Sequence, residues 1–208
     1  MTDATQEHRA DLGSEATPRA SAGAPLESPL VWIDLEMTGL DPENEAIVEL
    51  AVIVTDGGLE RVEEGPDLVI GQPRALLDSM DPVVVDMHTA SGLIEEILGS
   101  TVTVAEAEQQ ALDFISRWVP KARTAPLAGN SVHADRAFLS RYMPQLEAFV
   151  HYRNVDVSTI KELARRWYPE VLPQAPTKTG GHRALADIRE SIEELRWFRA
   201  EIFRQTEA

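Results

Sequence analysis

Apolar runs separated by turn residues mark out three strands in the first part of the chain. The first run covers residues 31–39, the second covers 46–55, and a shorter segment covers 61–70. Polar and glycine-containing turns lie between them, at 38–42 and 56–58. We therefore expect the second and third segments to form an antiparallel meander.

Further along, short apolar runs alternate with segments of helical periodicity. Thr103 and Glu106 form a capping box that predicts a helix start, and apolar residues then recur at helical spacing as far as Trp118. Residues 77–88 show no clear period and are expected to be irregular. The other predicted elements are a short helix at 91–98, strands at 126–130 and 154–157, and helices at 134–142, 158–168 and 184–203. Strands that alternate with helices after a meander predict an α/β domain with a mixed sheet.

Two carboxylates interrupt the first apolar run. Side chains on a strand alternate between its faces, so Asp34 and Glu36 project from one face while Ile33 and Leu35 pack on the other. Repulsion between two such neighbours raises a pKa or requires a cation, and oxygen ligands suit Mg²⁺ or Mn²⁺. The alternative is an edge strand whose acids are solvated.

Composition limits the domain organisation. With 208 residues and an apolar fraction of 43%, the chain can form one domain with a real core. Residues 1–28 hold hardly any large apolar side chain, so we expect a disordered tail there and a folded domain over 29–208. The tail is either a dispensable extension or a docking segment.

Charge and cysteine content restrict the function. The formal net charge of −16 disfavours long duplex DNA more than short single strands, which need few phosphate contacts. The chain has no cysteine, so any metal must be held by oxygen or imidazole. No apolar stretch reaches about 18 residues, and the N-terminus lacks the features of a signal peptide, so we expect a cytoplasmic protein with no membrane span.

Three later residues are candidates to join Asp34 and Glu36. Asp135 lies in the first turn of a predicted helix, His182 follows two glycines, and Asp187 lies beside the apolar face of the last helix. Each also has an ordinary explanation. An acid at a helix start complements the helix dipole, and a histidine in a loop is usually polar surface.

Taken together, these residues resemble the three motifs of the DEDDh 3′→5′ exonucleases. The motifs are Asp34-x-Glu36, then Asn130 and Asp135 in one segment, then His182-x-x-x-x-Asp187. Residues 32–40, 88–93 and 151–159 further resemble one branch of that family, whose members degrade very short RNAs. The likeness begins near residue 29 and continues to the last helix. One departure is Val83, which stands where many relatives carry an aromatic residue that stacks on a base.

The resemblance implies an RNase H-like α/β fold, with helices flanking a mixed central sheet of about five strands. It also implies a homodimer that removes nucleotides from short single-stranded RNA, two to about five nucleotides long, and releases 5′-mononucleotides. Two divalent ions, Mg²⁺ or Mn²⁺, would be held by four acids, and His182 would deprotonate the attacking water. The implied metal ligands are Asp34, Glu36, Asp135 and Asp187.

The same resemblance implies roles in substrate binding. Leu40 would wedge against the bases with His88 nearby, three residues would grip the 5′-phosphate, and Tyr152 would reach the site from a partner subunit. The phosphate residues are Ser131, Arg153 and Ser158. Arginine suits this role because its planar fork binds phosphate bidentately. The alternative for each of these residues is ordinary surface or core packing.

Two other functions stay open. A proofreading or general DEDDh exonuclease would share the acids and the histidine, but a proofreading enzyme is expected to carry a polymerase-binding extension. A non-catalytic nucleic-acid-binding module of the same fold is expected to have lost an acid or the histidine, and all five are present.

Overall fold

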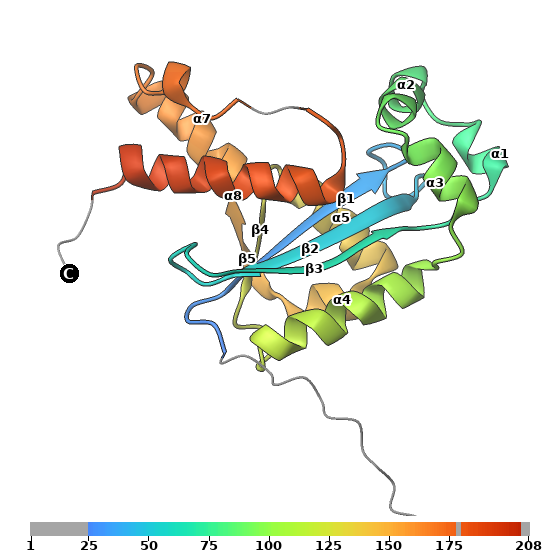
Figure 1. Ribbon diagram of the computed structural model, residues 1–208, viewed down its shortest axis with the longest axis horizontal. Coiled ribbons are helices and arrows are strands. Elements are labelled where there is room, and N and C mark those ends of the chain that lie inside the picture. The colour runs from blue at the N-terminus through green and yellow to red at the C-terminus, as the bar shows by residue number, and fades with distance from the viewer. Residues whose placement is uncertain (1–24, 178–179, 205–208) are drawn as a thin grey trace, which may run out of the picture.

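A mixed five-stranded sheet runs through the centre of the protein, with helices on both of its faces (Figure 1). The computed structural model describes residues 25–177 and 180–204. The strand order is β3-β2-β1-β4-β5, in which β1, β2 and β3 are antiparallel neighbours while β4 and β5 join in parallel. The strands are β1 (Leu30–Met37), β2 (Ile47–Thr55), β3 (Val62–Val69), β4 (Pro126–Gly129) and β5 (His151–Asp156). The predicted meander and mixed sheet are confirmed.

Eight α-helices and one 3-10 turn surround the sheet within the described part of the chain. They are α1 (Arg74–Leu77), α2 (Pro82–Ala90), α3 (Leu93–Gly99), α4 (Val104–Trp118), α5 (His133–Tyr142), α6 (Pro144–Phe149), α7 (Val157–Trp167), η1 (Leu172–Gln174) and α8 (Ala184–Glu201). The capping box predicted at Thr103 and Glu106 is present at the start of α4. The sequence pattern did not predict α6.

The alternation along β1 divides the core between the two faces of the sheet. Val31, Ile33 and Leu35 pack in the cluster that includes α4, α5 and α6. Trp32 packs in the other cluster, beneath α7 and α8. Because side chains alternate along a strand, Asp34 and Glu36 share the face of Trp32, which is the face that α8 covers.

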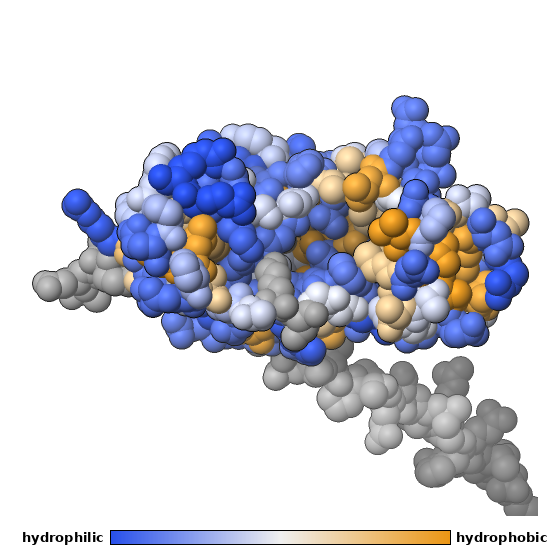
Figure 2. Space-filling model, turned by 90° about the horizontal axis from the view of Figure 1, so that it is seen from above, coloured by the Kyte–Doolittle hydropathy of each residue, from blue (hydrophilic) through white to orange (hydrophobic). Residues whose placement is uncertain are grey.

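Residues 77–88 are not irregular as predicted, because most of them belong to helices. Pro82 occupies the first turn of α2, and the Asp81 carboxylate caps it by accepting from the Val83 amide at 2.9 Å. Three consecutive valines have weak helix propensity and concealed this start. Packing of α2 against α3 and β2 outweighs that local preference. Figure 2 shows apolar side chains gathered at the end of the molecule formed by α1, α2 and α3.

The described chain begins inside the region that we expected to be a tail. Leu26 is buried in the core cluster, and the Glu27 carbonyl accepts from the Gly57 amide at 2.9 Å. Residues 1–24, where most of the expected tail falls, lie outside the described residues.

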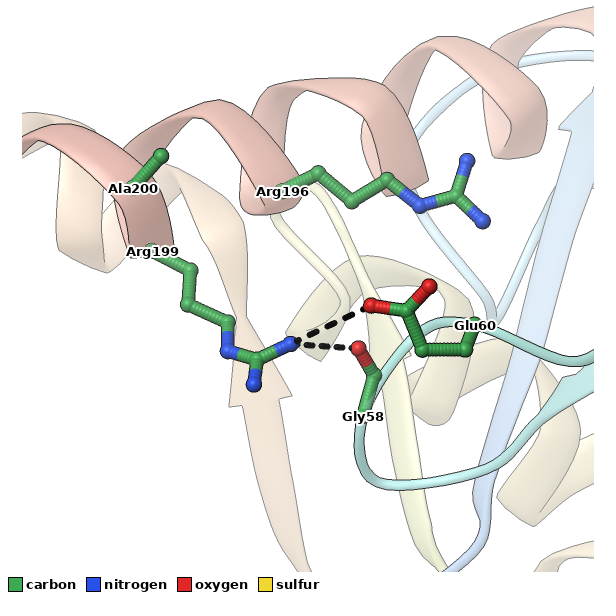
Figure 3. Close-up of a pocket in the computed structure, with 5 residues that line it drawn as sticks. All are labelled: Gly58, Glu60, Arg196, Arg199 and Ala200. Atoms are coloured by element: carbon green, nitrogen blue, oxygen red, sulfur yellow. Dashed lines mark hydrogen bonds and ion pairs between the residues drawn. The ribbon is translucent and has the colours of Figure 1, made fainter. Parts of the chain in front are cut away.

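The two ends of α8 have different surroundings. Near its C-terminal end, Arg196 and Arg199 line a pocket of about 390 Å³ beside the β2–β3 turn (Figure 3). Both guanidinium groups already donate to carbonyls of that turn, those of Leu59 and Gly58. The N-terminal end of α8, about 18 Å away at 1.5 Å per residue, lies beside the acids of β1.

Candidate active site

The first half of the site forms at the C-terminal end of β1, where this strand is no longer paired with β4. β1 pairs with β2 along its length but with β4 only through Val31 and Trp32, so its later edge on that side is open. The Leu35 amide on this edge donates to the Asp135 carboxylate at 3.0 Å. This bond brings Asp135, from α5, next to Asp34 and Glu36, so three of the predicted acids meet at the end of one strand.

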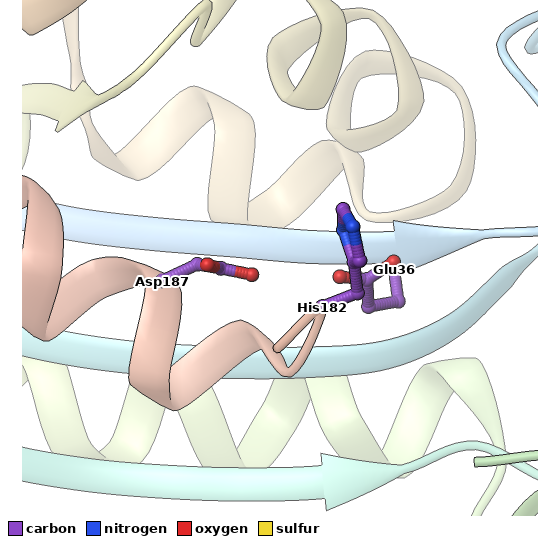
Figure 4. A group of neighbouring side chains, drawn as sticks. All are labelled: Glu36, His182 and Asp187. Carbon is purple, nitrogen blue, oxygen red and sulfur yellow. The ribbon is translucent and has the colours of Figure 1, made fainter. Parts of the chain in front are cut away.

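The second half comes from the start of α8. Ligand atoms of Glu36, His182 and Asp187 all lie within 4.8 Å of one another. Figure 4 shows His182, in the loop before α8, beside Glu36, with Asp187 projecting from the first turn of the helix toward the same space. The structure therefore brings together the four predicted acids and the predicted base from positions up to 153 residues apart, Asp34 to Asp187.

Burial and crowding act on the proton affinities of these acids. Burial, followed by repulsion from neighbouring carboxylates, raises the pKa of Asp34 well above its ordinary value. The same causes raise the pKa of Glu36 to about 8. Burial raises the pKa of Asp135 to about 7, although the Leu35 amide works in the opposite direction. Without a cation, this cluster would hold protons near neutral pH.

The side chains present fit a hard divalent cation. Carboxylates gathered on a rigid strand and two helix starts offer oxygen ligands from several directions, which Mg²⁺ and Mn²⁺ favour. A bound cation would replace the protons and relieve the repulsion that raises these pKa values.

The sequence profile of the exonuclease family matches residues 31–195, a span that contains all five of these residues. The chain belongs to the exonuclease family. Curated relatives carry the name oligoribonuclease. The protein from Halorhodospira halophila is 58% identical over 175 residues, which cover 84% of this chain and 94% of the relative. The protein from Leifsonia xyli subsp. xyli is 56% identical over 174 residues, which cover 84% of each chain.

Solved structures of exonuclease I share the fold of this exonuclease. The enzyme from Methylocaldum szegediense aligns with a TM-score of 0.61 at 20% identity, over 84% of this chain and 41% of that one. E. coli exonuclease I in complex with a dT13 oligonucleotide aligns with a TM-score of 0.63 at 15% identity, over 85% and 41%. This chain thus spans about two-fifths of those proteins, and the likeness concerns the fold. The predicted RNase H-like exonuclease fold is confirmed.

Two of the three predicted phosphate-binding residues of this exonuclease lie together. The Ser131 and Ser158 hydroxyls are 3.2 Å apart, beyond the C-terminal ends of β4 and β5. One oxygen of the Asp156 carboxylate accepts from both serine amides, at 3.1 and 2.9 Å. Asn130 accepts from the Ser158 hydroxyl at 2.9 Å. The two hydroxyls are therefore held at fixed positions.

The third predicted phosphate ligand, Arg153, lies on the edge strand β5. Its guanidinium is 5.2 Å from the ring centroid of Tyr152, and both side chains are exposed. Two apolar side chains also face solvent: Leu40, which follows β1, is 81% exposed, and Val83, in α2, is 74% exposed.

His88 requires a correction. We expected it to lie on the substrate, but its side chain is 0% exposed. Its Nε2 lies 2.9 Å from the Met37 carbonyl, and its Nδ1 lies 3.9 Å from a Glu36 oxygen without a hydrogen-bond partner. Because α2 is a helix, His88 faces inward beneath the end of β1. There its ring lies next to Glu36, and in this structure its side chain presents no exposed surface to a nucleotide.

Sequence reasoning missed Glu49 and Arg183. Glu49 is fully buried on β2, directly opposite Glu36 in the strand pairing. It accepts from the Arg183 guanidinium at 2.9 Å and from the Ala184 amide at 3.0 Å. One signal was available: Glu49 is the only charged residue in the apolar run over residues 46–55, and a buried charge needs a partner.

Proposed function

We propose that this chain is a metal-dependent 3′→5′ exoribonuclease that degrades RNAs of two to about five nucleotides to 5′-mononucleotides. The observation that carries this proposal is the meeting of Glu36, His182 and Asp187 within 4.8 Å, at a strand end that also bears Asp34 and Asp135. The oligoribonuclease name of relatives that are more than half identical over most of the chain supports the choice of short RNA.

Four residues would hold the metal. Asp34 would serve as a shared ligand, because burial and the neighbouring carboxylates make an uncompensated charge there unfavourable. The other three ligands would be Glu36, Asp135 and Asp187. Two bound ions, Mg²⁺ or Mn²⁺, would supply water activation and stabilisation of the departing 3′-oxygen.

His182 would accept the proton of the attacking water. Its backbone has φ of +46°, and its side chain is exposed in the loop before α8, so the ring is open to solvent on one side and to the acids on the other. A positive neighbour would favour the neutral imidazole, which is the form that accepts a proton.

The preference for short RNA would come from the 5′ end. The Ser131 and Ser158 hydroxyls, with Arg153, would bind a terminal 5′-phosphate at a fixed distance from the metal ligands. Leu40 would rest against the bases, and Val83 would offer an aliphatic contact where relatives stack an aromatic ring. A longer RNA would have to displace nucleotides from this closed space.

We further propose a homodimer. Exposed apolar side chains line a groove of about 220 Å³ between α7 and the end of α8, among them Leu163, Trp167 and Phe203. Apolar area of this kind is usually covered by a partner. A second copy seated there would place an exposed Tyr152 near the site of its partner.

The expected compartment is the cytoplasm. Within the described ranges, no helix is both long and apolar enough to cross a bilayer.

A general single-strand exonuclease is the second candidate, because the fold matches exonuclease I structures solved with DNA oligonucleotides. A digestion series separates the two functions. End-labelled RNAs of two, three, five, seven and twenty nucleotides would be incubated with and without Mn²⁺ or Mg²⁺. We expect metal-dependent cleavage that is fastest for the dinucleotide. Equal rates at every length would favour the general exonuclease.

A further inference from the structure

An ion pair between Glu49 and Arg183 lies next to Glu36, one of the proposed metal ligands. Glu49 is 0% exposed on a strand whose other members are apolar except Thr55. A carboxylate in such a place is costly unless fully paired. Its two oxygens are taken up by the Arg183 Nε at 2.9 Å and by the Ala184 amide at 3.0 Å. Glu49 is therefore engaged with the start of α8 and is not free to serve as a further metal ligand.

Arg183 joins this carboxylate to a second one. Its two terminal nitrogens donate to the two oxygens of Glu96, both at 2.9 Å, in a bidentate pair. Glu96 lies on α3, whereas Glu49 lies on β2. The guanidinium thus connects α3 to the sheet. Its planar group of donors binds both carboxylates in a fixed orientation, which the single ammonium group of a lysine could not do.

Arg183 stands in the chain between the proposed base, His182, and the proposed metal ligand Asp187. It directly follows His182, and its carbonyl accepts from the Asp187 amide at 3.0 Å in the first turn of α8. His182 adopts a positive φ, which a residue with a side chain holds only when its surroundings impose it. The bonds that Arg183 donates to Glu49 and Glu96, and the bond that the Ala184 amide donates to Glu49, hold the backbone directly after His182. The same bonds hold the start of α8, where Asp187 lies four residues after Arg183.

We propose that Glu49, Arg183 and Glu96 act as positioning residues for the hydrolytic reaction. They hold His182 and Asp187 in register with the acids of β1, and none of the three binds the substrate. This inference rests on the proposed role of His182 as the base. A structural pair of the same chemistry lies further along α8, where Arg189 donates two bonds to Glu64 at 2.8 and 2.7 Å.

The Arg189 pair provides a matched control for the test. Glu96→Ala removes an exposed partner and leaves Glu49 paired, so the fold is expected to survive. We expect its kcat to fall about tenfold, because small misplacements of a catalytic group cost up to roughly a hundredfold. KM for the dinucleotide should stay within about twofold of wild type, whereas Mn²⁺ affinity, measured by calorimetry, should fall because Asp187 is one of the proposed metal ligands. Glu64→Ala and Arg189→Ala should keep the wild-type kcat.

A second variant separates positioning from stability. Arg183→Ala leaves a buried charge unpaired, so lowered thermal stability is expected along with lowered kcat. The double variant Glu49→Leu with Arg183→Ala removes that charge and should regain stability without regaining kcat. Arg183→Lys should recover only part of the rate, because an ammonium group cannot bind both carboxylates in the same geometry.

Two outcomes would overturn the inference. Wild-type kcat in both Glu96→Ala and the stabilised double variant would mean that the clamp is structural only. A rise in KM with unchanged kcat in the Arg183 variants would mean that Arg183 binds substrate directly. His182→Ala is measured alongside: if it is fully active, the proposed base is wrong, whereas an inactive His182→Ala beside active clamp variants removes only the positioning role.

Discussion

Asp34 combines two opposing demands in one side chain. Its strand position leaves it half-buried, yet four other carboxylates lie close enough to repel its charge. An apolar residue there is expected to stabilise the metal-free fold, so the presence of an acid supports the proposed role of Asp34 as a metal ligand. The same reasoning applies to Glu36 and Asp135, whose pKa values are raised by burial first.

Replacing Asp34 by Ala should abolish turnover by about three orders of magnitude or more, because a shared ligand is lost. The fold should survive, since removing a repelled buried charge costs little stability. The measurement is dinucleotide hydrolysis in Mn²⁺, with Asp113→Ala on the exposed side of α4 as the control. Near-normal rates for Asp34→Ala would contradict the metal assignment.

His182→Ala should lower kcat by about a hundred- to ten-thousandfold, which is the range for loss of a general base. Metal affinity, measured by titration calorimetry, should stay close to wild type because His182 does not coordinate the metal in the proposed mechanism. A parallel loss of Mn²⁺ binding would instead make His182 a metal ligand, which its distance from Glu36 and Asp187 permits.

The metal-free protein should lose stability as pH rises. The pKa values of Glu36 and Asp135 are about 8 and 7 in the fold, against ordinary values of 4.5 and 3.8. The native state therefore binds more protons than the unfolded state between these limits, so the stabilisation present at low pH disappears as pH approaches 8. Thermal melts in EDTA at pH 5 to 8.5 test this trend. Adding Mn²⁺ should flatten it, and a melting temperature in EDTA that rises over this range would contradict the assignment.

At the scale of elements, the ends of secondary structure carry the chemistry. β1 supplies two acids beyond its last pairing with β4, and α5 and α8 each supply one acid in their first turn. Ser131, after β4, meets Ser158 at the start of α7. The regular parts of these elements are packed in the core. The candidate site therefore lies at one end of the central strand β1, where its pairing with β4 has stopped and side chains from several elements converge.

Arg153→Ala should weaken binding of a 5′-phosphorylated dinucleotide by about ten- to a hundredfold, since each charge-assisted hydrogen bond lost costs roughly 1.5 to 3 kcal/mol. Binding of the same dinucleotide without that phosphate should change little. Both affinities are measured with Ca²⁺ in place of the activating metal. Arg165→Ala, on the exposed side of α7, is the control. Equal losses for the two ligands would remove Arg153 from the phosphate site.

At the scale of the whole molecule, acidic charge and exposed apolar surface are distributed unequally. The chain has a net charge of −16, yet Leu40 and Val83 are exposed, and further exposed apolar side chains line the groove of α7 and α8. We assign the first to bases and the second to another copy of the chain.

Trp167→Glu should convert the proposed dimer into a monomer, because a carboxylate in an apolar interface is left without water or a partner. Sedimentation measures the mass, and the dinucleotide assay measures the rate. We expect the monomer to lose activity with all four acids intact, and Tyr152→Ala to lose activity as a dimer. A fully active monomer would exclude a role for Tyr152 across the interface.

Local patterns in the sequence determined most of the elements and the pairing of Asp34 with Glu36 on one face of a strand. The alternation of Asp34 and Glu36 with apolar neighbours, and the capping box at Thr103, depend on residues near in the chain, so they could be interpreted without the fold. Family resemblance added Asp135, His182 and Asp187, and the structure then placed all five residues together. Their individual roles stay predictions.

Only the tertiary structure decided where His88 and Glu49 lie. His88 is buried because α2 packs on α3 and β2 in spite of its weak local propensity, and Glu49 is paired with a residue 134 positions away. The lone charge of Glu49 in an apolar run indicates that it needs a partner, but neither segment identifies the partner of its buried side chain. Long-range packing sets the partner of a buried polar group, so the support behind the acids became visible only once β2, α3 and the start of α8 were brought together.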